Sequence, residues 1–147
     1  MSQLTTQLIL GAGLIFAATA VQTIGIAFAM MARPRLVRHF KRATLLNMIV
    51  LICLLTLWLL SWQMAGVWIW ALSLLWIDAF QDLEHAIYFS LAAYTTLGFG
   101  DVLPPLDWRV LGSVAGANGM LAFGLGTAAL VAMVQGIQSD MSGDRQH

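Results

Sequence analysis

The stretch Thr95-Thr96-Leu97-Gly98-Phe99-Gly100-Asp101 decides the fold, because neither a helix nor a strand accommodates it within an otherwise apolar chain. Glycine alternates here with larger residues, and Gly98 and Gly100 can take positive φ angles at little cost. Such alternation can turn successive carbonyl oxygens to the same side of the backbone. Four copies of the stretch around an axis would then form stacked rings of carbonyl oxygens, which can replace the water shell of a cation.

The composition of the chain places it in a membrane. Of its 147 residues, 60% are hydrophobic and 10% are charged, and the formal net charge is zero. A soluble domain of this size needs far more charge to cover its surface. A zero net charge also offers no basic surface for the phosphates of a nucleic acid. These figures exclude a soluble globular domain, a disordered chain and a nucleic-acid binder, and they indicate an integral membrane protein.

Three uncharged runs are long enough to cross the hydrocarbon core, which takes about 20 apolar residues. We expect the spans at 8–32, 43–64 and 110–137. Pro34 is expected to end the first helix at about Arg33, because proline disfavours helical backbone in the residue before it. The third run is rich in small residues, including a GxxxG pair at positions 112 and 116, which lets helix backbones approach closely.

The second run continues without charge to Ile77, which is too far for one span. A straight helix over 43–77 would measure roughly 52 Å at 1.5 Å per residue. We therefore predict a break near Ala65-Gly66. The following segment carries three tryptophans, which favour the membrane interface, so we expect it at the outer surface. The alternative is that this segment extends the second helix outwards.

The charged residues are split between the loops. Five of the seven basic residues lie between Arg33 and Arg42, and five of the seven acidic residues lie between Asp78 and Asp107. Short loops rich in lysine and arginine stay in the cytoplasm. We therefore expect the N-terminus outside, the acidic stretch outside and the C-terminus in the cytoplasm. A second interpretation of Arg33–Arg42 is contact with anionic lipid headgroups.

A short apolar and aromatic helix pattern over 85–94 precedes the glycine-spaced stretch and cannot cross the membrane. Irregular backbone persists at membrane depth only where it is buried in protein or lines a water-filled path. We therefore predict a re-entrant helix followed by a loop, with the negative end of the helix dipole directed at the pore axis. Thr96 would add a ring of hydroxyl groups at the inner end of the loop.

The stretch TTLGFGD at 95–101 resembles the selectivity filter of the tetrameric potassium channel family, usually written TTVGYGD. The resemblance extends over about 79–134, which looks like a pore helix, a filter, an external turn and an inner helix. Within it, 123–130 closely resembles the inner helix of small bacterial potassium channels. The resemblance implies an all-α membrane protein with three transmembrane helices, a re-entrant pore helix and a selectivity-filter loop, assembled as a homotetramer.

The resemblance also implies residue roles. Its filter positions hold potassium through backbone and hydroxyl oxygens, and these positions here are Thr96, Leu97, Gly98 and Phe99, with Gly100 completing the outer mouth. The residues expected to support the filter are Thr95, Asp101 and Tyr88. Gly119 falls at the position of a gating hinge. The residues expected to line the inner cavity and gate are Met120, Phe123, Thr127 and Val131, although packing of one helix face would give the same spacing.

Three positions depart from the family pattern. Phe99 replaces the usual tyrosine and loses a hydroxyl that can brace the filter from behind. Leu97 replaces valine, a mild change because only its carbonyl would face the ion. Ala92 stands where some bacterial relatives carry a glutamate behind the filter. We hypothesise that Tyr88 instead hydrogen-bonds Asp101 across the back of the loop.

From these observations we expect a passive potassium channel with no cofactor other than bound potassium ions. We expect the channel to lie in a lipid bilayer. The compactness of the chain and its resemblance to small bacterial potassium channels indicate a bacterial inner membrane. The expected division of the chain is a first helix with its basic loop at 1–42, an outer helix with the tryptophan-rich segment at 43–78, a pore module at 79–138 and a tail at 139–147.

Several alternatives remain open at this point. A non-selective cation channel of the same fold and a non-conducting subunit of a mixed assembly are the nearest. A membrane enzyme finds no support, because the sequence has no nucleophile–base pairing and no ligand cluster within a span. The stretch 95–101 could be a plain extracellular turn. Asp78, Asp82, Glu84 and His85 could be read as a metal cluster, but such groups at a water interface are more often solvated.

Overall fold

The computed structural model describes residues 3–39 and 45–143, and these form an all-helical fold. The elements are α1 (Gln3–His39), α2 (Leu45–Trp76), α3 (Leu83–Tyr94), a short 3-10 helix η1 (Leu106–Trp108) and α4 (Arg109–Gly143). Three stretches are long and apolar enough to cross a membrane, at Gln3–Ala32, Leu46–Trp76 and Leu106–Ile137. The predicted all-α class is therefore confirmed, as is the presence of three helices of membrane-spanning length, although the second extends well beyond its predicted end at 64.

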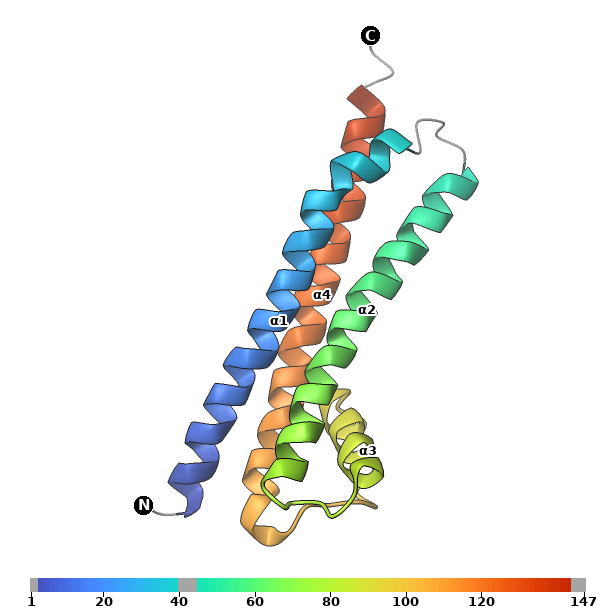
Figure 1. The fold of residues 1–147 in the computed structure, drawn as a ribbon. Coiled ribbons are helices and arrows are strands. Elements are labelled where there is room, and N and C mark those ends of the chain that lie inside the picture. Colours follow the sequence, from blue (N-terminus) through green and yellow to red (C-terminus); the bar gives the residue numbers. More distant parts are fainter. Residues whose placement is uncertain (1–2, 40–44, 144–147) are drawn as a thin grey trace.

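The three long helices lie side by side, and α3 lies at one end of them (Figure 1). The beginning of α1 lies at the same end as α3, as do the end of α2 and the beginning of α4. The opposite end holds the end of α1, the beginning of α2 and the end of α4. The acidic stretch 78–107 and the basic segment that ends α1 are therefore at opposite ends of the bundle.

The first helix is longer than predicted. We expected Pro34 to end it at about Arg33, but α1 continues to His39 with Pro34 inside it, so this prediction was wrong. Proline removes a single helical hydrogen bond, and the N–H groups of the residues after it can still bond four residues back. Helices that cross membranes tolerate proline where neighbouring groups or a local adjustment of the helix satisfy the freed backbone group. The predicted lipid-binding segment Arg33–Arg42 extends outside the described residues, which stop at 39 and resume at 45.

The second helix is continuous. The predicted break near Ala65-Gly66 was wrong, and the alternative that this segment extends the helix is correct, because α2 runs to Trp76. Gly66 is needed for packing and does not end the helix. It is buried, and a Cβ there would lie 2.5 Å from the hydroxyl of Tyr94 on α3.

The core of the bundle joins α2, α3 and α4. Trp70 and Leu74 of α2, Phe89 and Tyr94 of α3, and Leu111 of α4 are all buried in one cluster. Small residues on α4 bring α3 close to it. A Cβ at Gly112 would lie 2.7 Å from the ring of Phe89, and one at Gly116 would lie 3.3 Å from the carbonyl oxygen of Ala93. The predicted close approach at the GxxxG pair is confirmed, and its partner is α3.

Polar side chains within the apolar spans join α1 to the other helices. The carbonyl oxygen of the Gln7 side chain accepts a 3.0 Å hydrogen bond from the backbone N–H of Leu111, in the first turn of α4. That N–H belongs to the group at a helix start that has no partner within the helix. The indole N–H of Trp58 donates to the carbonyl oxygen of Gly25 at 3.0 Å. The first helix is therefore fixed to its own chain by directional bonds.

A second set of polar contacts links all three long helices. Asn118 of α4 accepts a 2.9 Å hydrogen bond from the indole N–H of Trp70 and donates to the hydroxyl of Thr19 at 3.4 Å. The amide nitrogen of Gln22 donates to the carbonyl oxygen of Ala122 at 2.6 Å and to the side-chain oxygen of Gln63 at 3.0 Å. Since such groups are costly to leave unpaired in lipid, these bonds specify how the helices pack.

Candidate ion-conduction site

The helix before the candidate filter begins with a capped turn. The backbone before Leu83 is extended at Asp82, whose carboxylate accepts a hydrogen bond from the N–H of His85 at 2.9 Å. The imidazole Nδ1 of His85 lies 2.7 Å from the same carboxylate. The hydrogen bonds from His85 lower the pKa of Asp82, and the hydrogen bond to Asp82 raises the pKa of His85. An aspartate at this position is the usual cap of a helix start and suits its dipole.

We predict that Asp82→Asn lowers the pKa of His85 towards the ordinary value of 6.5, because asparagine keeps the cap but removes the negative charge. Both pKa shifts favour the charged forms of Asp82 and His85 in the folded chain. The pair stabilises the fold most between pH 3.8 and 6.5, and loses this effect as the pH rises through the raised histidine pKa or falls through the lowered aspartate pKa. An NMR titration of the histidines checks this, with His85→Gln identifying the signal. An unchanged histidine pKa would contradict it.

The backbone leaves α3 through an ordered turn. The N–H of Thr95 bonds to the carbonyl oxygen of Leu91 at 2.9 Å, and its hydroxyl bonds to the same oxygen at 2.7 Å. The N–H of Thr96 then bonds to the carbonyl oxygen of Ala93, and that of Gly98 to the carbonyl oxygen of Ala92. These bonds satisfy carbonyls at the end of the helix and attach the candidate filter to it.

The backbone of the candidate filter alternates in handedness. Gly98 and Gly100 have φ angles of 55° and 79°, so the predicted positive φ at both glycines is confirmed. Thr96 also has a positive φ, of 62°, which the sequence analysis did not predict. Within the described chain, the carbonyl oxygens of Thr96 to Phe99 accept no hydrogen bond from the protein. Successive carbonyl groups in this loop are therefore free to bind something else.

Tyr88 reaches the outer end of the loop. Its hydroxyl donates a 2.7 Å hydrogen bond to the carboxylate of Asp101, so the hypothesised contact is present. This bond lowers the pKa of Asp101 and raises the pKa of Tyr88. This bond attaches the outer end of the loop to the middle of α3. The N–H bonds of Thr96 and Gly98 attach only the beginning and middle of the loop, and they attach it to the end of α3.

The residues predicted to line an inner cavity lie on α4 beyond the loop. Met120, Phe123, Thr127 and Val131 are all exposed in the isolated chain. Gly119, the predicted hinge, is buried, and a Cβ there would overlap the carbonyl group of Tyr94. The close contact between α4 and the end of α3 therefore requires a glycine at position 119, whether or not this residue acts as a hinge.

The acidic residues around α3 do not gather. Among the residues that the structure describes, no three His, Cys, Asp or Glu side chains lie close enough to hold a metal ion. Of the four considered residues, Asp82 and His85 are joined by a side-chain contact of 2.7 Å.

Sequence reasoning missed the polar contacts that join the long helices. It treated Trp70 as an interfacial residue, yet this side chain is fully buried against Asn118, one residue before Gly119. It did not single out Asn118, Gln7 or Gln22. The available signal was a carboxamide within an otherwise apolar run, which is costly unless it finds a partner.

The model of a family described as "Ion channel" matches residues 48–136, which is more than half of the chain and includes α3, the loop and most of α2 and α4. Comparison with curated proteins and with solved structures gave no significant match. With three helices of membrane-spanning length, the chain is an integral membrane protein. The matched region covers the elements described above, and the chain therefore belongs to this ion channel family.

Proposed function

We propose that the chain is the subunit of a homotetrameric, potassium-selective channel in which 95–101 is the selectivity filter. The observation that carries this proposal is the alternation of positive φ angles at Thr96, Gly98 and Gly100, with the intervening carbonyl oxygens unpaired. Rings of such oxygens can replace the water shell of a potassium ion as it enters the pore. In this proposal the potassium ions are the cargo, and no cofactor takes part.

The exposure of the loop supports assembly with further copies. Leu97 and Phe99 are 61% and 67% exposed, an unfavourable state for large apolar side chains beside a membrane-embedded pore. A ring of four copies would bring the loops together around one axis and cover these side chains. Closed cyclic symmetry is the usual way in which identical chains form such a ring.

In the proposed channel, α3 is a re-entrant pore helix that ends at Tyr94, and α4 lines the inner cavity with Met120, Phe123, Thr127 and Val131. The segment Arg33–Arg42 faces the cytoplasm, where it contacts anionic lipid, and the acidic stretch faces outwards. This orientation follows the rule that basic loops stay inside. It places the N-terminus outside and the C-terminus in the cytoplasm of, we propose, a bacterial inner membrane.

The test is ion flux through the purified full chain in liposomes. Potassium and sodium gradients of equal size are compared, with barium added as a blocker of potassium size. We expect flux with potassium alone, and loss of that flux with barium. Equal sodium flux would leave a non-selective cation channel. Absence of both fluxes, together with failure to form a tetramer, would favour a subunit that needs a different partner chain.

We predict that Tyr88→Phe makes potassium flux decline faster after opening and makes it sensitive to acid at a higher external pH. The variant removes the bond that lowers the pKa of Asp101, so this carboxylate takes up a proton at a higher pH than in the native chain. The measurement is flux against external pH and against time. Ser113→Ala is the control, since it removes a hydroxyl that bonds only within its own helix. Unchanged decline and pH dependence would contradict a bracing role for Tyr88.

A further inference from the structure

The inner half of α4 has different neighbours from its outer half. The close approaches of α3 to α4 lie at three glycines, and the last of these is Gly119. No residue described outside α4 has an atom within 4 Å of a Cβ added at Gly124. A Cβ added at Gly126 would lie 3.6 Å from the amide nitrogen of Gln22, which belongs to α1. Along these glycines, the neighbour of α4 therefore changes from α3 to α1.

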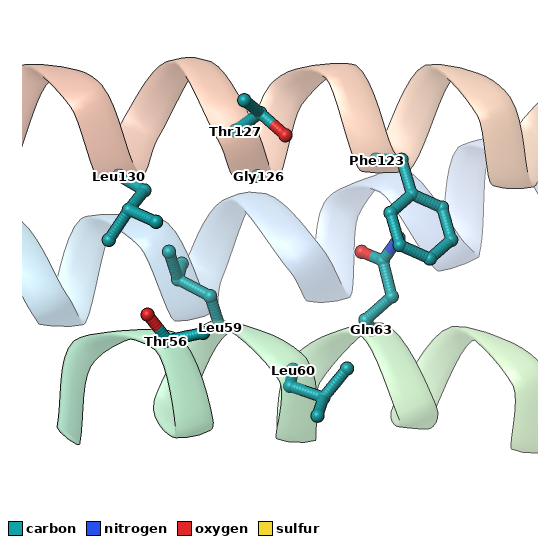
Figure 2. A pocket seen from close by; sticks show the side chains of 8 residues that line it. All are labelled: Thr56, Leu59, Leu60, Gln63, Phe123, Gly126, Thr127 and Leu130. Carbon is teal, nitrogen blue, oxygen red and sulfur yellow. The ribbon is translucent and has the colours of Figure 1, made fainter. Parts of the chain in front are cut away.

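The second helix leaves space beside the same part of α4. A pocket of about 140 Å³ lies between the two helices, with Leu59 and Leu60 of α2 on one side and Phe123, Thr127 and Leu130 of α4 on the other. Figure 2 shows the ribbon of α1 passing between those of α2 and α4 along this pocket. Over its whole length, α4 also packs more extensively against α1 than against α2. The first helix is therefore the main support of α4 at this level.

One side chain of α1 joins all three long helices here. The amide nitrogen of Gln22 donates a 2.6 Å hydrogen bond to the carbonyl oxygen of Ala122 on α4, and a 3.0 Å hydrogen bond to the side-chain oxygen of Gln63 on α2. The side chains of Gln22 and Gln63 are 3% and 4% exposed. Because water does not reach these groups, breaking either bond would leave another polar atom buried without a partner.

The bond to Ala122 reaches the side of α4 opposite the residues proposed to line the inner cavity. At about 3.6 residues per turn, Ala122 lies roughly 200° around the helix from Met120, whereas Phe123, Thr127 and Val131 lie within roughly 60° of Met120. Ala122 is buried, and the other four residues are exposed in the isolated chain. The first helix therefore lies behind the proposed pore-lining face, on the side towards which α4 would move if the inner pore widened.

We infer that α1 restrains the inner half of α4, and that Gln22 is a positioning residue for the pore-lining side chains. The inference rests on the proposed function, because it takes the exposed face of α4 as the wall of the pore. When the pore widens, α1 either slides along α4, which breaks the bond from Gln22 to Ala122, or moves with α4 away from α2, which breaks the bond to Gln63. Each route loses a buried hydrogen bond, so α1 stabilises the narrower pore.

This restraint comes from outside the part of the chain that the family shares. The matched region covers residues 48–136, and α1 ends at His39. The inner helix and its proposed pore-lining residues therefore belong to the family fold, while the side chain that holds them in place comes from the additional helix.

The first test measures the position of α4 and does not require conduction. Spin labels are attached to the full chain at two exposed positions, through Ile49→Cys on α2 and Gln135→Cys on α4, with Cys53→Ser removing the native thiol. Labelled chains are diluted with unlabelled chains in lipid vesicles, and pulsed electron paramagnetic resonance gives the distribution of distances between the two labels. Gln22→Leu is similar in size but has no donor, and it should broaden this distribution.

Two further variants make the distance measurement specific. Gln7→Leu is the matched control, because it also removes a buried carboxamide of α1, but one that bonds Leu111 at the outer end of α4. It should leave the distribution as in the native chain. Ile26→Ala keeps the bonds of Gln22 and reduces the packing of α1 at the inner end, where Met133 is buried. It should also broaden the distribution, and it serves if Gln22→Leu does not assemble.

The second test is potassium flux in liposomes. Gln22→Leu should raise the initial rate about fivefold, the change that the loss of one hydrogen bond makes to an equilibrium, and should leave the preference for potassium over sodium as in the native chain. Gln7→Leu should give the native rate. General damage to the fold would lower the flux, so an increase distinguishes a positioning role from a merely structural one.

Each contrary result has a defined meaning. A native distribution in both Gln22→Leu and Ile26→Ala would show that α1 does not hold α4. Equal broadening in Gln7→Leu would mean that losing any buried amide of α1 loosens the bundle, and would overturn the role of Gln22. Unchanged or reduced flux with a broadened distribution would contradict the stabilisation of a narrower pore. Absence of flux in the native chain would contradict the proposed function instead, and the distances would still decide whether α1 positions α4.

Discussion

Gly98→Ala should abolish potassium flux while leaving the assembled protein intact. Gly98 has a φ of 55°, a conformation that costs roughly 1–2 kcal/mol for an alanine. Apart from the two chain neighbours, no residue that the structure describes has an atom within 4 Å of an added Cβ, so the strain comes from the backbone and not from a clash. Relief of that strain by a change in φ would rotate the adjoining carbonyl groups. In four copies this would disrupt two neighbouring rings of oxygens.

Two measurements check this result together. Flux in liposomes should fall to the background of empty vesicles, and size-exclusion chromatography should give the same elution volume as the native protein. Gly13→Ala is the matched control, because a Cβ there also meets nothing within 4 Å but the residue lies within α1. Normal flux through Gly98→Ala would contradict the proposal that this loop is the selectivity filter.

Gly119→Ala should destabilise the fold more than the same substitution at any other glycine of α4 that the structure describes. The new Cβ would overlap the carbonyl oxygen of Tyr94 and lie 2.7 Å from its Cα, and these backbone atoms cannot move aside alone. The end of α3 would have to separate from α4, at a cost of about 1–3 kcal/mol or more. Thermal unfolding in detergent should therefore begin at a clearly lower temperature than in the native protein.

The same variant distinguishes a packing role of Gly119 from its predicted role as a gating hinge. A hinge alone would give a variant of native stability with altered gating, since alanine is the better helix former. Gly124→Ala is the control, because a Cβ at Gly124 meets nothing within 4 Å and should leave stability unchanged or slightly increased. Native stability of Gly119→Ala would contradict the packing explanation.

The spans and the loop could be read from the sequence because they depend on local properties. Apolar length identifies a membrane helix, and the spacing of Gly98 and Gly100 predicts their positive φ angles. The positive φ of Thr96 could not be read in this way, because threonine rarely adopts it and only the loop as a whole imposes it.

The errors came from residues whose effect depends on the rest of the fold. Gly66 looks like a helix break in the sequence, but its missing side chain makes room for Tyr94. Pro34 looks like a helix end, yet α1 continues through it to His39. Trp70 suggests an interface, yet α3 and α4 bury it. The neighbours of Gly66 and Trp70 lie far from them in sequence, so no local pattern indicates them.

The polar contacts between the long helices have a consequence for how the chain enters its membrane. Gln7, Gln22, Gln63 and Asn118 each lie in a span, and a helix inserted alone would hold such an amide in hydrocarbon without a partner. The order of the helices along the chain provides some of these amides with partners early. Gln22 and Gln63 can pair as soon as the second helix has followed the first, and the carbonyl of Ala122 becomes available only when the last helix arrives. Insertion and association are therefore coupled, and a chain begun after α1 would reach the bilayer with Asn118 and Gln63 lacking partners that only the first helix supplies.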